Sequence, residues 1–148
     1  MITEVRVSNY RSIGPDVSLK LGAMTALVGP NGSGKSNLAD MFRFIADALT
    51  LGLEASIQQR HGIDAVRRWS SGRPFNLSIT VLVKEPTFSG SYMFTLAGSS
   101  AEDYRVKTEE AFVIPSSDGA AEKFRLSEGK WTEGPSDLRP KVTTKSLA

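Results

Sequence analysis

Nine consecutive residues near the N-terminus have the composition of a phosphate-binding loop. Residues 28–36, VGPNGSGKS, match the pattern G-x-x-x-x-G-K-[ST]. The glycines of this pattern let successive backbone N–H groups approach phosphate oxygens. Lys35 can reach the β- and γ-phosphates of a nucleotide, and the Ser36 hydroxyl can ligate Mg²⁺. The loop therefore predicts a site for a nucleoside triphosphate with magnesium.

The segments on either side of the loop predict the order strand, loop, helix. Residues 24–28, MTALV, form a short apolar run that is typical of a buried strand in a parallel sheet. After the loop, apolar side chains recur at helical spacing, at Leu38, Met41, Phe42, Ile45 and Leu49. Gly52 is a suitable C-cap, so we expect a helix over about 36–51 with its apolar face on the sheet.

The rest of the chain predicts strands around this unit. Loose alternation predicts strands at 2–9 and 17–21, and a weaker helical region, interrupted by Gly62, covers 53–69. From residue 75 the hydrophobic period changes to two, which predicts an antiparallel meander to residue 114 and a last hairpin from 123–126 and 130–132. The expected fold class is α/β or α+β, with a mixed sheet, one helix after the loop and the meander beside it.

One domain is expected, with a short tail. Residues 1–134 form the lobe, in which 1–52 carry the loop, 53–74 are an arginine-rich connection and 75–134 are antiparallel strands. The 148 residues include no cysteine and no apolar run near the ~20 residues of a membrane span. We therefore expect a cytoplasmic protein without a membrane partner. We expect residues 135–148 to be flexible.

Two groups of residues outside the loop can be interpreted either as functional or as ordinary surface residues. His61 has no cysteine or acidic ligand pattern nearby, so a solvated side chain is favoured over a metal or catalytic group. The arginines around Trp69 predict either a patch that faces nucleic acid or phosphate, or a solvated face with one buried indole; the second is favoured. These arginines are Arg60, Arg67, Arg68 and Arg73.

Two segments together carry a resemblance to a known family. Residues 7–13, VSNYRSI, and 25–38, TALVGPNGSGKSNL, resemble the N-terminal lobe of ATPases of the SMC and RecF branch of the ABC type, often labelled AAA-family ATPases. The resemblance implies an ATP and Mg²⁺ site, with Ser36 as the metal ligand and a turn at Arg11 and Ser12 near the nucleotide. The loop residues that it places at the nucleotide are Gly29, Pro30, Asn31, Gly32, Ser33, Gly34, Lys35, Ser36 and Asn37. At Tyr10, where ABC transporters carry an adenine-stacking aromatic, a core aromatic is favoured.

Two motifs of such ATPases are missing from the sequence. One is an apolar strand that ends in Asp-Glu. The acidic pair Glu109-Glu110 does not match it, because it follows Val106-Lys107-Thr108 on a strand that the pattern predicts to be half-exposed. The other is the Leu-Ser-Gly-Gly signature; residues 126–129, LSEG, are interpreted as a hairpin turn, because Lys130, Trp131 and Gly134 do not continue a helix. We therefore expect no catalytic residue and little or no hydrolysis by this chain alone.

The preferred interpretation is an ATP-binding lobe that works in DNA repair, DNA maintenance or phage defence. We expect the 148 residues to be a fragment, so a C-terminal ATPase lobe is the expected partner. The complete protein would hydrolyse ATP and form an ATP-dependent homodimer. DNA is a candidate partner. The alternative is a non-catalytic nucleotide-binding module that acts by binding a partner. A small kinase is disfavoured by the missing acidic pair and by the antiparallel sheet.

Overall fold

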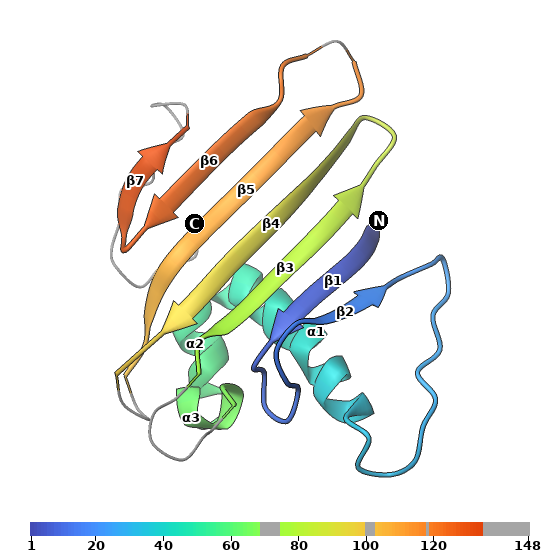
Figure 1. Cartoon of the computed structure of the whole chain (residues 1–148), viewed down its shortest axis with the longest axis vertical. Coiled ribbons are helices and arrows are strands. Elements are labelled where there is room, and N and C mark those ends of the chain that lie inside the picture. Colours follow the sequence, from blue (N-terminus) through green and yellow to red (C-terminus); the bar gives the residue numbers. More distant parts are fainter. Residues whose placement is uncertain (69–74, 100–102, 118, 135–148) are drawn as a thin grey trace.

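One antiparallel sheet and three helices build the fold in this computed structural model, which describes residues 1–68, 75–99, 103–117 and 119–134. The strands are β1 (Ile2–Ser8), β2 (Val17–Lys20), β3 (Leu77–Lys84), β4 (Phe88–Ala97), β5 (Arg105–Pro115), β6 (Glu122–Ser127) and β7 (Lys130–Glu133). They lie in the order β2-β1-β3-β4-β5-β6-β7 (Figure 1). Every neighbouring pair is antiparallel. The α/β fold class is confirmed, and the sheet is antiparallel rather than mixed.

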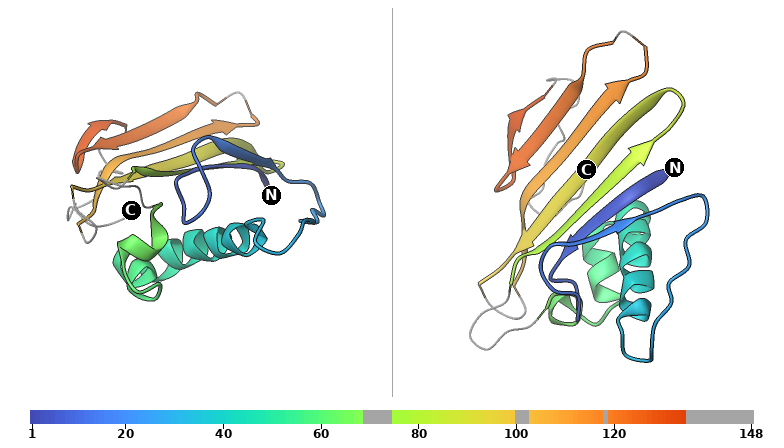
Figure 2. Two further views of the ribbon diagram at one scale, coloured as in Figure 1. Left: turned by 60° about the horizontal axis from the view of Figure 1, so that its bottom comes forward. Right: turned by 45° about the vertical axis from the view of Figure 1, so that its right-hand side comes forward.

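The three helices lie on one face of the sheet (Figure 2). They are α1 (Lys35–Leu51), α2 (Leu53–Gln58) and α3 (Ile63–Val66). The helix expected at 36–51 is thus confirmed, and Gly52, with φ 91°, ends it. The interrupted helical region after it is also confirmed, as two short helices separated around Gly62. None of the helices in the described ranges has the length and apolar character needed to span a bilayer.

The core lies between α1 and the first strands of the sheet. Alternation along β3 turns Leu77, Ile79 and Val81 toward the helices, and the buried face of α1 meets them. That face consists of Met41, Phe44, Ile45 and Ala48. The fully buried rings of Tyr10, Phe44 and Phe94 continue this core, so Tyr10 is the core aromatic that the sequence favours.

The strand expected at 24–28 is absent, and this expectation was wrong. The segment runs outside the sheet on the way from β2 to α1 (Figure 1). Its apolar side chains face solvent: Met24 is 91% exposed and Val28 93%. An apolar run becomes a buried strand only where a neighbouring strand supplies hydrogen bonds and a cover. The described residues supply neither, so two strands, not three, precede the first helix.

The meander after residue 75 follows the sequence prediction closely. Strands β3, β4 and β5 pair along nearly their whole lengths, and β6 with β7 forms the last hairpin. Glu128 and Gly129 connect β6 to β7, with φ 47° and 72°. Two successive positive φ angles are typical of a type I′ hairpin turn, which confirms residues 126–129 as a turn. The tail predicted at 135–148 lies outside the described residues.

Candidate functional site

The N-terminus of α1 is an open anion-binding end. Gly34 precedes the helix in a left-handed conformation, with φ 91°, and no side chain caps the first turn. No acidic residue occupies that turn either. The first N–H groups of a helix have no partner within the helix and carry the positive end of its dipole. This end therefore favours a phosphate group.

Lys35 folds back over the loop that precedes it. Its Nζ atom lies 2.7 Å from the carbonyl oxygens of Gly29 and of Pro30, and 3.2 Å from Oγ of Ser33. The ammonium group has three N–H donors, and all three have partners in the loop. Lys35 thus holds the loop closed around the point at which the helix begins.

The loop and the first helical turn enclose a hollow of about 240 Å³. Its lining is made by Asn31, Gly32, Gly34, Lys35, Ser36 and Asn37. Gly32, like Gly34, has a positive φ, and a Cβ atom on Gly29 would lie 2.9 Å from Ser33 Oγ. Backbone donors, a cation and the Ser36 hydroxyl are the groups that bind phosphate and Mg²⁺, so these residues fit a nucleotide with magnesium.

The turn at residues 10–12 lies against the same helix. Asn37, in the first turn of α1, donates from Nδ2 to Oγ of Ser12 at 2.5 Å. Arg11 pairs with Asp40, with 3.0 Å between Nη2 and Oδ2. The structure therefore brings the two residues of the N-terminal turn, predicted from the resemblance alone, to the helix that carries the phosphate loop.

A carboxylate pair on α1 is a feature that the sequence analysis missed. Asp40 and Asp47 lie two turns apart on one side of α1, and Arg60 bridges them at 3.4 Å and 2.8 Å. The Arg60 guanidinium also lies over the ring of Phe44, 5.3 Å from its centroid. The spacing of seven residues between the two aspartates was the available signal, since it places both on one helix face.

Two arginines of the cluster, Arg60 and Arg67, differ from both of its interpretations. Arg60 is 8% exposed and Arg67 is 3% exposed, so neither lies on a solvated face or in a patch for nucleic acid. Arg67 donates to the carbonyl of Asp103, and the backbone of Arg68 donates to the carbonyl of Asn9. Trp69 and Arg73 lie outside the described residues. His61 is exposed, as expected.

Glu109 is fully buried on β5, whose alternation of buried and exposed side chains is that of the predicted half-exposed strand. It accepts a hydrogen bond from the Tyr92 hydroxyl at 2.5 Å, and burial raises the pKa of that phenol, with the carboxylate adding to the shift. Its strand β5 lies in the antiparallel meander, several strands from the phosphate loop (Figure 1). Glu109 thus has a place in the core of the sheet, and Glu110 pairs with Arg125.

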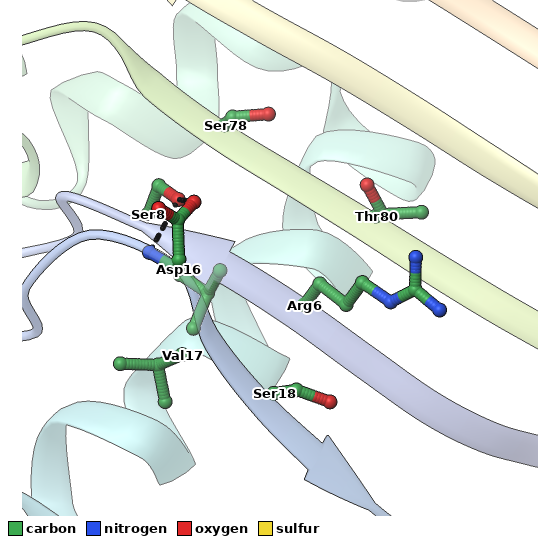
Figure 3. Close-up of a pocket in the computed structure, with 8 residues that line it drawn as sticks. Arg6, Ser8, Asp16, Val17, Ser18, Ser78 and Thr80 are labelled. Atoms are coloured by element: carbon green, nitrogen blue, oxygen red, sulfur yellow. Dashed lines mark hydrogen bonds between the residues drawn. The ribbon is translucent and has the colours of Figure 1, made fainter.

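A second polar hollow, of about 230 Å³, lies on the sheet face opposite the helices (Figure 3). Hydroxyl groups from β1, β2 and β3 surround it. Asp16 is tied to Ser8, both through its carboxylate and through its backbone N–H, and Arg6 pairs with Glu4. No residue that the sequence predicts for the nucleotide site lines this hollow, so the loop at the start of α1 is the candidate site.

Comparison with known proteins relates most of the chain to a known family of domains. A search of curated proteins finds no match to the chain. The family described as "AAA domain, putative AbiEii toxin, Type IV TA system" matches residues 24–144, which include the phosphate loop and most of the chain. This match, together with the phosphate loop and the open helix end, shows that the chain belongs to that family of AAA domains. The domain is of the nucleotide-binding, ATPase-like type.

Proposed function

We propose that this chain binds MgATP as the nucleotide-binding lobe of an ATPase of the SMC and RecF branch, acting in DNA repair, DNA maintenance or phage defence. The observation that carries the proposal is the uncapped N-terminus of α1 with Lys35 beside it. The family description, which names a putative toxin of a toxin–antitoxin system, fits phage defence best among these roles.

The proposed site uses backbone and side chains for separate tasks. The backbone N–H groups of the loop hold the phosphates, except at Pro30, which has none. Lys35 exchanges its bonds to the loop carbonyls for the β- and γ-phosphates. Ser36 ligates the metal, and Mg²⁺ neutralises phosphate charge when it is bound. Arg11 and Ser12 complete the site from the N-terminal turn, because both are fixed to α1.

The segment at 24–28 supports the proposal of a second ATPase lobe as partner. Its exposed apolar side chains, with Met24 and Val28 both more than nine-tenths exposed, are those of a strand that a neighbour would cover. Such a lobe would also supply the acidic residues and the signature motif that orient water for hydrolysis. We propose that ATP then joins two complete copies into a dimer.

The test is calorimetric titration of MgATP into the 148-residue chain, with phosphate release followed on the same samples. We compare wild type with Lys35→Ala, and with Lys130→Ala as a matched loss of one positive charge from an exposed position on β7. The expected result is saturable binding by wild type and Lys130→Ala, binding weakened at least about tenfold in Lys35→Ala, and no phosphate release. Equal binding by all three proteins would contradict the proposal.

Phosphate release by wild type that Lys35→Ala abolishes would show a complete hydrolase instead of a lobe. The alternative, a non-catalytic binding module, makes a different prediction. In that case nucleotide would change association with a partner, and adding the second lobe would produce no turnover.

A further inference from the structure

Asp40 connects three separate segments of the chain at one carboxylate, one helical turn after the phosphate loop. Its Oδ2 atom accepts a hydrogen bond from the hydroxyl of Tyr10 at 2.5 Å and lies 3.0 Å from Nη2 of Arg11. Its Oδ1 atom lies 3.4 Å from Nε of Arg60. The carboxylate thus ties the N-terminal turn and the connection after α2 to the helix of the phosphate loop.

Arg11 is held from both sides. Its φ of 48° lies in the left-handed region that residues other than glycine rarely adopt. Its backbone N–H donates to the carbonyl of Val66 at 2.8 Å, while its guanidinium meets Asp40. Within the described part of the chain, its Nε atom is buried and has no hydrogen-bond partner. A strained, doubly held arginine with a spare donor is typical of a residue placed for a ligand.

The position of Arg11 points to the nucleotide as that ligand. The next residue, Ser12, is bonded to Asn37, which lines the hollow at the start of α1. Asp40 follows Ser36 by four residues, so about one turn of helix, or ~6 Å, separates the arginine's anchor from the phosphate site. An arginine side chain can cover that distance.

We propose that Asp40 is a positioning residue that holds the Arg11 guanidinium about one helical turn from the phosphate hollow, within reach of a bound nucleotide. The inference rests on the proposed function, and it adds a residue that the loop pattern does not contain. Arg60 keeps the carboxylate in place, because it is buried and also bound to Asp47 at 2.8 Å. Tyr10 donates to the same oxygen that Arg11 meets, so the carboxylate has a fixed orientation.

A double-mutant cycle on the 148-residue chain tests the proposal, with MgATP as the probe. The four proteins are wild type, Arg11→Ala, Asp40→Ala and the double variant. If Asp40 acts through Arg11, each single substitution weakens MgATP binding by about tenfold and the double variant is no weaker than either. Additive losses would overturn the proposal, because Asp40 would then act independently of Arg11. Asp40→Asn, which keeps the shape of the side chain, is measured alongside in case Asp40→Ala does not fold.

Tyr92→Phe is the matched control, since it removes one buried phenol hydrogen bond, to Glu109 in the meander, and leaves Asp40 and Arg11 untouched. We expect it to lower the melting temperature and to change the affinity for MgATP less than about twofold. If Lys35→Ala weakens binding as expected, wild-type affinity in a folded Asp40→Asn variant would overturn the proposal and leave the proposed function standing. Failure of wild type itself to bind MgATP would overturn the proposed function, and this inference with it.

Discussion

A bound nucleotide has to replace the hydrogen bonds that Lys35 already makes within its own loop. The ammonium group already has three oxygen partners in its own loop. Phosphate therefore competes with two backbone carbonyls and a hydroxyl, and the net gain is smaller than for a lysine that points into water. The pattern G-x-x-x-x-G-K-[ST] predicts which residues form the site, but it does not contain this competition.

Arg60 is the residue whose loss we expect to cost the most stability near the site. Arg60→Met keeps the apolar stem but removes the charge between Asp40 and Asp47. Because the guanidinium is buried and stacked on Phe44, we expect a loss of about 2 kcal/mol in unfolding free energy. Urea unfolding measures it, with Arg43→Met, an exposed residue of the same helix, as the control that changes less than about 0.5 kcal/mol. Equal losses in the two variants would refute the assignment.

The burial of Arg60 could not be predicted from its neighbours in the sequence. Arg60, Arg67 and Arg68 resemble a basic surface cluster when they are read in order. Arg60 is buried because α2 returns against α1, where two aspartates and an aromatic ring meet it. Partners that are distant in the chain decided its environment.

At the scale of elements, the segment between β2 and α1 is the least protected part of the site. Residues 24–28 lie outside the sheet with Met24 and Val28 exposed. We expect their amides to exchange with deuterium at nearly unprotected rates, while those of β3 exchange slowly because both sides of β3 are paired. Exchange followed by mass spectrometry checks this, and protection of 24–28 equal to that of β3 would contradict the fold described.

The turn between β6 and β7 offers a stabilising substitution. Glu128 has a positive φ, which asparagine tolerates far better than glutamate in front of glycine. Glu128→Asn also removes the exposed pair with Arg105, which is worth little, so we expect a net gain of about 0.5 kcal/mol in unfolding free energy. Thermal unfolding measures it. Glu133→Asn, which removes the exposed pair with Lys123 from within a strand, should give no gain.

Local pattern was sufficient for most elements, and it failed where a partner was needed. Alternation along β3 and the apolar spacing of α1 predicted both elements, because each is amphipathic and covered on one side by the other. Residues 24–28 have an equally apolar pattern but no cover. Periodicity describes what a segment would bury; it does not show whether the fold supplies a neighbour.

At the scale of the whole molecule, the tyrosines link folding to alkaline pH. The chain has three tyrosines, and burial is the main cause that raises the pKa of Tyr10, Tyr92 and Tyr104 above the ordinary value of 10.0. The folded protein therefore favours the neutral phenols. Their contribution to stability is complete below pH ~10, the pKa in the unfolded chain, and is lost as the pH rises further.

Ultraviolet absorbance of tyrosinate, recorded with circular dichroism, checks this coupling. We expect the native protein to ionise Tyr10 and Tyr92 only together with unfolding, at a pH above that of the chain in guanidinium. Ionisation of all three tyrosines near pH ~10 in a protein that keeps its circular dichroism would contradict the burial of Tyr10 and Tyr92. Tyr92→Phe should remove one third of the change in absorbance.

The pairing of β1 with β3 has a consequence for how the protein is made. Val5 pairs with Val81, so the phosphate loop and all three helices belong to one long excursion between neighbouring strands. On the ribosome, β1 and the apolar residues 24–28 emerge well before β3 is synthesised. β1 can pair early only with β2, so its other edge waits for β3, and residues 24–28 have no strand partner in the described part of the chain. Strands joined by short turns, β3 to β7, form quickly from local contacts. Chaperone capture during synthesis is thus expected at the N-terminal segment, and the nucleotide loop is the part of the fold to be organised last.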